Sequence, residues 1–149
     1  MQGPQKETGV GNTAEQTQAI AALREAYAAF NRGDIDAAVE SLDEHIEWSE
    51  PAEFPGGGTY HGREGAKRYL AQSREVWAEV ASEPEQFIVH GNLVVVFVQA
   101  RVRAKGSNDW QDVKLADVYT FRAGKAIRMQ AFADRQQALR SVGLEAPAG

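Results

Sequence analysis

Residues 113–134 read VKLADVYTFRAGKAIRMQAFAD, and this stretch predicts two antiparallel strands joined by a turn at Ala123-Gly124. Successive side chains of a strand point to opposite faces of the sheet, so alternation sorts this hairpin into two faces. One face is predominantly apolar and should be buried. Its apolar members are Val113, Leu115, Tyr119 and Phe121 in the first strand, and Ile127, Met129 and Ala131 in the second.

Asp117 is the exception, because it places a carboxylate in the middle of the apolar face. An unpaired buried charge is costly, so this carboxyl should be paired, hydrogen-bonded or protonated. No cation is expected on the same face, since the nearby arginines alternate outward; these are Arg101, Arg103, Arg122 and Arg128. Desolvation should then raise the pKa of Asp117 well above its usual value of about 3.9. The residue is either a structural carboxylate or an acid–base group.

Length and composition bound the remaining interpretation. A chain of 149 residues suits one domain with a real core, and a net charge of −5 disfavours a general nucleic-acid or anionic-membrane surface. The chain has no cysteine, which excludes disulfides and thiolate chemistry. The first residues lack the apolar core of a signal peptide, and no run reaches membrane-spanning length. A cytoplasmic protein is the default expectation.

The pattern along the chain predicts a disordered tail at residues 1–13, one domain at 14–144 and a flexible tail at 145–149. Thr13 and Gln16 can form a capping box that opens a helix with an apolar stripe, and Gly33 ends that helix. Asp34 can cap a short second helix. The later elements are predicted as a strand at 45–49, a Gly- and Pro-rich loop at 50–61, a helix at 63–80, a break at Pro84, strands at 86–90 and 93–105, the hairpin, and a helix at 135–142.

This order predicts an α+β fold in which helices cover the concave face of a strongly curved antiparallel sheet. Such an arrangement is cone-shaped and leaves a cavity at its mouth. The opposite face of the sheet is expected to be free. Phe97 and Phe132 point toward it, so we expect a homodimer through the sheet.

Several motifs resemble the NTF2-like superfamily, in particular its SnoaL-like and ketosteroid-isomerase-like branch. They are NRGD followed by IDAAVESL, then IEWSEP, YHGREGAKRYL and DVYTFRAGKAIRM, and together they span about residues 15–143. The resemblance implies the cone-shaped fold. It implies less about chemistry, because this scaffold hosts isomerases, cyclases, dehydratases, epoxide hydrolases and non-enzymatic binders.

The resemblance also suggests site residues. Ketosteroid isomerases have a general-base Asp before a Pro, and Glu50-Pro51 resembles that pair; Asp117 resembles their protonated, hydrogen-bond-donating Asp. Their helical Tyr falls on Ala26 here, with Tyr27 one residue later and so about 100° around the helix. The epoxide-hydrolase-like branch needs an Arg where this chain has Leu115, which disfavours that activity.

Two function classes stay open. The first is a cofactor-free isomerase, cyclase or lyase that moves protons on a hydrophobic carbonyl compound, with catalytic candidates Asp117, Glu50 and His61. The second is a non-catalytic small-molecule binder. The candidate substrate-binding residues are Trp48, Tyr27, Tyr60, Tyr119, Phe30, Val98 and Met129. No metal or cofactor is expected, because the three histidines show no paired ligand spacing and no phosphate-binding Gly motif occurs.

Overall fold

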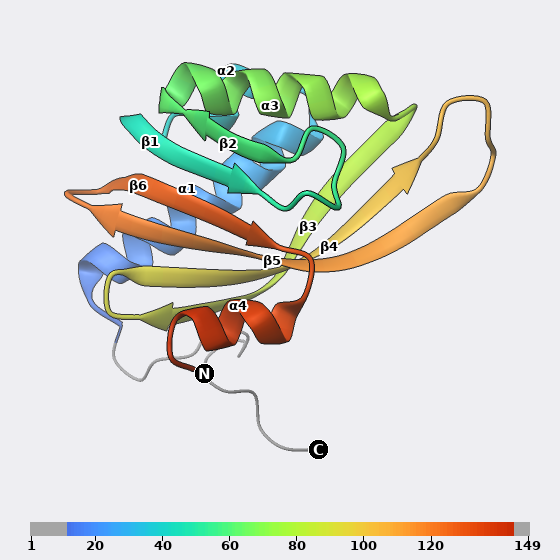
Figure 1. The fold of residues 1–149 in the computed structure, drawn as a ribbon. Coiled ribbons are helices and arrows are strands. Elements are labelled where there is room, and N and C mark those ends of the chain that lie inside the picture. Colours follow the sequence, from blue (N-terminus) through green and yellow to red (C-terminus); the bar gives the residue numbers. More distant parts are fainter. Residues whose placement is uncertain (1–11, 145–149) are drawn as a thin grey trace.

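A six-stranded sheet forms the centre of the computed structural model, which describes residues 12–144 (Figure 1). The strands are Leu42–Glu50 (β1), Gly58–His61 (β2), Glu79–His90 (β3), Leu93–Arg103 (β4), Trp110–Arg122 (β5) and Lys125–Phe132 (β6). The helices are Ala14–Asn31 (α1), Ile35–Ala38 (α2), Gly62–Val76 (α3) and Arg135–Ser141 (α4). This confirms the predicted α+β class. None of these helices within residues 12–144 is both long and apolar enough to cross a membrane.

The strands lie in the order β2-β1-β6-β5-β4-β3, and neighbours are antiparallel except for one pair. That exception joins β1 to β6 in parallel, with Trp48 opposite Met129. The predicted hairpin is confirmed as β5 and β6, in which Asp117 lies opposite Ala131. The pairing therefore brings the N-terminal strand β1 alongside the C-terminal hairpin.

Helix α1 begins as the sequence predicts. The side chain of Thr13 accepts a hydrogen bond from Gln16 N at 3.0 Å, and Thr13 N donates to Gln16 Oε1 at 2.9 Å, so the capping box is confirmed. The apolar stripe is buried against the sheet; its members are Ile20, Leu23, Tyr27 and Phe30. The stripe turns Tyr27 toward β5. Of the tail predicted at 1–13, residues 1–11 lie outside the described residues, as does the whole tail predicted at 145–149.

The helix predicted at 63–80 is too long. Helix α3 ends at Val76, and β3 begins at Glu79. The next residue of β3, Val80, pairs with Val102 of β4. The backbone hydrogen bonds of this strand outweigh the helical spacing that Trp77 and Val80 happen to show. The break predicted at Pro84 is also wrong, because Pro84 lies within β3, at a register shift where a residue without an N–H is tolerated.

Two further sequence expectations are wrong. The predicted loop at 50–61 ends in a short strand, β2, which pairs with β1 and places Ser49 Oγ 3.1 Å from Thr59 Oγ1. In β6, a register shift pairs Phe121 with Ala126 and leaves Ile127 without a partner. Ala126 is consequently buried, and Ile127 is only half-buried.

The two faces of the sheet are covered by different helices (Figure 1). One face packs against α1 and α3 in the main core. The other face was expected to be free, but α4 covers part of it through Ala138 and Leu139, which pack on a cluster that includes Val95 and Val118. Phe97 and Phe132 are half-buried against this cluster, so they already have a partner within the chain. A homodimer through this face stays a prediction.

Candidate active site

A cavity of about 510 Å³ lies between the sheet, α1, α3 and the loop that follows β1. Sheet residues form its floor, and most of the wall is aliphatic or aromatic. The lining residues are Ala26, Tyr27, Phe30, Ala38, Trp48, Glu50, Glu53, Phe54, Pro55, Tyr69, Leu70, Ser73, Trp77, Val80, Ser82, Val98, Ala100, Val102, Gln111, Val113, Leu115, Asp117 and Tyr119. Small-molecule sites are typically mostly apolar with a few placed polar groups, and this cavity has that character.

Asp117 lies in the middle of β5 and is buried, with 9% of its surface exposed. The hydroxyl of Tyr27 donates a hydrogen bond to its Oδ2 at 2.5 Å, and the Tyr119 hydroxyl lies 3.1 Å from that of Tyr27. Burial raises the pKa of Asp117 from 3.8 to about 6, and the hydrogen bond from Tyr27 opposes this rise. Among the described residues, no cation forms an ion pair with it.

Glu50 is the last residue of β1 and faces the same cavity. Its Oε2 accepts a hydrogen bond from Trp48 Nε1 at 2.8 Å. Burial raises the pKa of Glu50 from 4.5 to about 8, the charge of Asp117 raises it further, and hydrogen bonds from Trp48 and Tyr69 oppose the rise. The two carboxyls therefore interact electrostatically and lose their protons in different pH ranges.

Tyrosine hydroxyls surround the two carboxyls. Burial raises the pKa of Tyr27, Tyr69 and Tyr119 above the ordinary value, and the neighbouring carboxyls add to each rise. These hydroxyls consequently stay protonated throughout the physiological range and can act as hydrogen-bond donors. The polar part of the cavity holds acids and neutral donors.

The structure brings most of the predicted site residues together. Asp117, Glu50 and five of the predicted substrate-binding residues line the cavity, the five being Trp48, Tyr27, Tyr119, Phe30 and Val98. The one-residue offset does not take Tyr27 out of the site, because its hydroxyl reaches Asp117.

Three predicted site residues lie elsewhere. His61 is exposed at the start of α3, where its side chain makes no capping hydrogen bond. The hydroxyl of Tyr60 donates to Gly56 O at 2.6 Å, and its ring packs against Tyr69, so it lies behind the cavity wall. Met129 is fully buried in the main core and does not line the cavity.

Sequence reasoning missed Tyr69 and Phe54 as site residues. Tyr69 carries only a helical spacing signal, which indicates burial on the inner face of α3 and says nothing about Glu50. Phe54 belongs to the loop after β1, whose path follows no regular period. That loop also contributes Glu53 and Pro55, so it forms one wall of the cavity.

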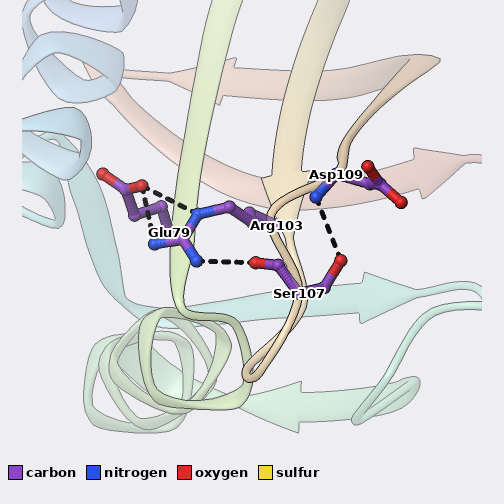
Figure 2. Close-up of polar contacts among 4 residues, drawn as sticks. All are labelled: Glu79, Arg103, Ser107 and Asp109. Atoms are coloured by element: carbon purple, nitrogen blue, oxygen red, sulfur yellow. Dashed lines mark hydrogen bonds and ion pairs between the residues drawn. The ribbon is translucent and has the colours of Figure 1, made fainter.

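Arg103, the last residue of β4, bonds to two neighbouring segments (Figure 2). Its Nη2 and Nε donate to Glu79 Oε1 at 2.9 and 3.1 Å, and its Nη1 donates to Ser107 O at 2.8 Å. These bonds join β3, β4 and the β4–β5 turn on the outside of the sheet. The preceding residue, Val102, lines the cavity and pairs with Gln111, which also lines it, so Arg103 holds the turn beside the cavity without lining it.

No metal-ligand cluster stands out in the described part of the chain, where groups of three or more His, Cys, Asp or Glu suited to a metal ion do not occur. The site offers acid–base groups and hydrogen-bond donors.

Comparison with known proteins gives the fold a family context. A family model described as the SnoaL-like domain matches residues 23–129. No curated protein matches the chain. Among solved structures, the chain is similar to TerC, which was co-crystallised with polyporic acid, at 29% identity and a TM-score of 0.71, covering 83% of this chain and 96% of TerC.

Two further solved structures share the fold. An NTF2-like protein of unknown function from Burkholderia pseudomallei K96243 is 26% identical with a TM-score of 0.71, covering 85% of this chain and 98% of that one. A putative SnoaL-like polyketide cyclase from Jannaschia sp. CCS1 is 20% identical with a TM-score of 0.71, covering 94% of this chain and all of the other. The last likeness concerns the fold alone.

Proposed function

The chain belongs to the SnoaL-like domain family, and from that premise we propose that it is a cofactor-independent enzyme that moves protons on a largely apolar small molecule with a carbonyl group. One observation carries the proposal: two carboxyls with unequally raised pKa values face one mostly apolar cavity. Pairs of acids whose environments separate their pKa values are suited to act as base and acid in one reaction. Isomerases, cyclases and lyases of this kind need no redox group.

We assign the base role to Asp117, whose carboxylate accepts the hydrogen bond from the Tyr27 hydroxyl, and the acid role to Glu50, whose pKa is raised by burial and by the charge of Asp117. With a pKa of about 6, Asp117 is mostly ionised at pH 7 and can accept a proton from the carbon next to the carbonyl. With a pKa of about 8, Glu50 is mostly protonated and can donate to the carbonyl oxygen as the enol forms. Asp117 then returns its proton to a different carbon, and the enol oxygen returns its proton to Glu50, which gives the isomer. These roles are the reverse of those that the family resemblance implies, in which Asp117 donates and Glu50 accepts.

A second candidate function is small-molecule binding without chemistry. The Tyr27 hydroxyl already donates to Asp117, so it is not free to bond a carbonyl oxygen, and this favours a binder. TerC, at 29% identity, was co-crystallised with polyporic acid, which supports a small-molecule ligand here under either candidate function.

Solvent exchange distinguishes an enzyme from a binder without knowledge of the natural substrate. Ketones with acidic neighbouring C–H bonds, with 2-tetralone as the first, would be incubated with the protein in D₂O and followed by NMR. We expect faster deuterium incorporation than in buffer, with a bell-shaped pH profile between about pH 6 and pH 8.

The variants that test the roles are Glu50→Gln and Asp117→Asn, with Asp112→Asn on the exposed end of β5 as the matched control. Loss of a positioned acid or base should slow exchange by about 100-fold or more, whereas the control should match the wild type. Exchange that is equally fast in the Glu50→Gln/Asp117→Asn double variant would remove the enzymatic proposal. Ketone binding without any exchange would establish the binder instead.

A further inference from the structure

The cavity is lined by acidic side chains and by no basic ones from the described residues. Its ionisable lining residues other than tyrosines are Glu50, Glu53 and Asp117, and no Lys, Arg or His from the described residues joins them. Strand alternation keeps the basic groups outside: Val102 lines the cavity, while Arg103 beside it bonds Glu79 on the outer surface (Figure 2). The described lining of the cavity therefore holds acidic groups and no basic side chain.

A buried carboxylate without a cation is in an unfavourable state. Asp117 has hydrogen-bonding neighbours, but these are neutral hydroxyls. The strands on either side place Val96 and Ala131 opposite it, and neither residue can titrate. Buried charges in proteins are normally paired, so the missing positive charge can come from a ligand.

Aromatic rings surround this carboxyl. The centroids of Trp48 and Tyr119 lie 6.5 Å apart, as do those of Trp48 and Tyr69, and Tyr27 meets Tyr119 edge to face. The faces of such rings attract cations, most strongly where water is excluded. Aromatic walls and an unpaired carboxylate thus favour the same ligand property.

We propose that the cavity takes an apolar ligand with one positive charge, of the protonated amine or iminium class, and that this charge lies beside Asp117. The inference rests on the proposed function, because it names the substrate class of the same site. It also excludes a class: carboxylates and phosphates would bring negative charge to a cavity whose ionisable lining residues, tyrosines aside, are all acids.

For a ligand of the iminium class, in which a protonated C=N group takes the place of the carbonyl, the positive charge also suits proton transfer to Asp117. When Asp117 removes a proton from the carbon next to a protonated C=N group, the C–H electron pair forms a C=C bond, and the C=N π electrons move to nitrogen. A carboxylate and an iminium ion thereby become a carboxylic acid and a neutral enamine. Negative charge never develops on the ligand, so no cationic residue is needed to stabilise it.

Three probes of similar shape test the inference by ligand-observed NMR. They are phenyltrimethylammonium, its neutral isostere tert-butylbenzene, and benzoate. At pH 7 we expect the cation to bind at least about tenfold more tightly than the neutral isostere, and we expect no detectable binding of benzoate. A quaternary ammonium has no proton to lose, so any pH dependence comes from the protein.

The groups that face Asp117 are Tyr27 from α1, Glu50 from β1, Tyr69 from α3 and Tyr119 from β5. The tyrosines stay protonated, so ionisation of Asp117 should control affinity below pH 7. From its pKa of about 6, the cation should bind about tenfold more weakly at pH 5 than at pH 7, and tert-butylbenzene should bind equally at both.

Variants and outcomes complete the test. Asp117→Asn should reduce the preference for the cation below about threefold while tert-butylbenzene still binds, which shows that the variant is folded; Asp112→Asn should change nothing.

Equal binding of cation and isostere, tighter binding of benzoate, or a pH-independent cation affinity overturns the inference. If that occurs while 2-tetralone exchange still depends on Glu50 and Asp117, the proposed function stands alone. If no probe binds and no exchange occurs, both fail.

Discussion

The carboxyls inside the cavity and those on the outer surface of the same sheet have opposite surroundings. Outside, Asp112 pairs with Arg101 at 3.0 Å and Glu79 pairs with Arg103 at 2.9 Å, and both acids are more than half exposed. Inside, Asp117 and Glu50 have only neutral donors. Asp112 and Asp117 belong to one strand, so the face on which a residue falls decides its chemistry.

This difference shows that the unfavourable burial of carboxyls is confined to the cavity side of the sheet. An exposed ion pair contributes little to stability because water screens it. A buried carboxyl with neutral partners has a raised pKa, and that property makes it useful as an acid or base. Three pairs of matched substitutions can break or sharpen the comparison.

The largest expected effect on stability is that of replacing Trp48 inside the cavity, and Trp110 on the outer side of the sheet is its matched control. Trp48 is 6% exposed, lines the cavity and donates to Glu50, whereas Trp110 is 43% exposed on the outer side. Trp48→Ala should reduce the free energy of unfolding by about 3 kcal/mol, near the lower end of such losses because a cavity already adjoins it. Trp110→Ala should cost less than about 1 kcal/mol. Urea melts at pH 7 would measure both, and a similar loss in the two variants would contradict the assigned faces.

The next effect is on how stability depends on pH. Burial raises the folded-state pKa of Asp117 above its unfolded value, so the wild type loses stability as pH rises from about 4 through about 6. Asp117→Asn keeps the shape without the titrating group. Between pH 4.5 and pH 8, the free energy of unfolding of the variant should therefore rise relative to that of the wild type by up to about 2 kcal/mol. At pH 8 the variant should be as stable as the wild type or more stable.

Asp112→Asn is the control on the same strand, and its effect should stay within about 0.5 kcal/mol at both pH values. Part of the wild-type slope should persist in Asp117→Asn, because Glu50 also has a raised pKa. An Asp117→Asn variant that loses more than about 2 kcal/mol at pH 8 would identify Asp117 as an ionised, paired structural group.

The smallest effect concerns two outer arginines. Arg103 is 26% exposed and bonds both Glu79 and Ser107, whereas Arg101 is 52% exposed and bonds Asp112. Arg103→Gln should cost about 1 kcal/mol, because it releases the turn at the cavity rim, and Arg101→Gln about 0.5 kcal/mol or less. Equal losses in thermal or urea melts would show that the bonds to the turn add nothing.

The inner face could be predicted because strand alternation is a local rule. Alternation alone identifies Asp117 as a carboxyl on an apolar face, and the family resemblance points to Glu50. The interaction between them could not be derived from the pattern, since it depends on β1 lying beside β6.

Other parts of the site were beyond the reach of periodicity. Helical spacing predicted that Tyr69 is buried but not that it faces Glu50, and the same spacing extended α3 wrongly through Trp77 and Val80. There the pairing of β3 with β4 decides the structure. Local patterns fix which face a residue occupies, and long-range pairing fixes which residues meet.

The parallel pairing of β1 with β6 has a consequence for the order of synthesis. Strand β1, which ends at Glu50, is synthesised early and can pair with β2 soon afterwards. Its partner on the other side, β6, is complete only when Lys125–Phe132 has also emerged from the ribosome. Pairings between distant segments form late, because the intervening chain must first be closed into a loop. Until then the backbone N–H and C=O groups of β1 that pair with β6 stay unpaired, and such an edge is a template for pairing with another nascent chain. A chain that stops after β5 would contain both carboxyls but would lack β6, the strand that lies between β1 and β5 in the sheet.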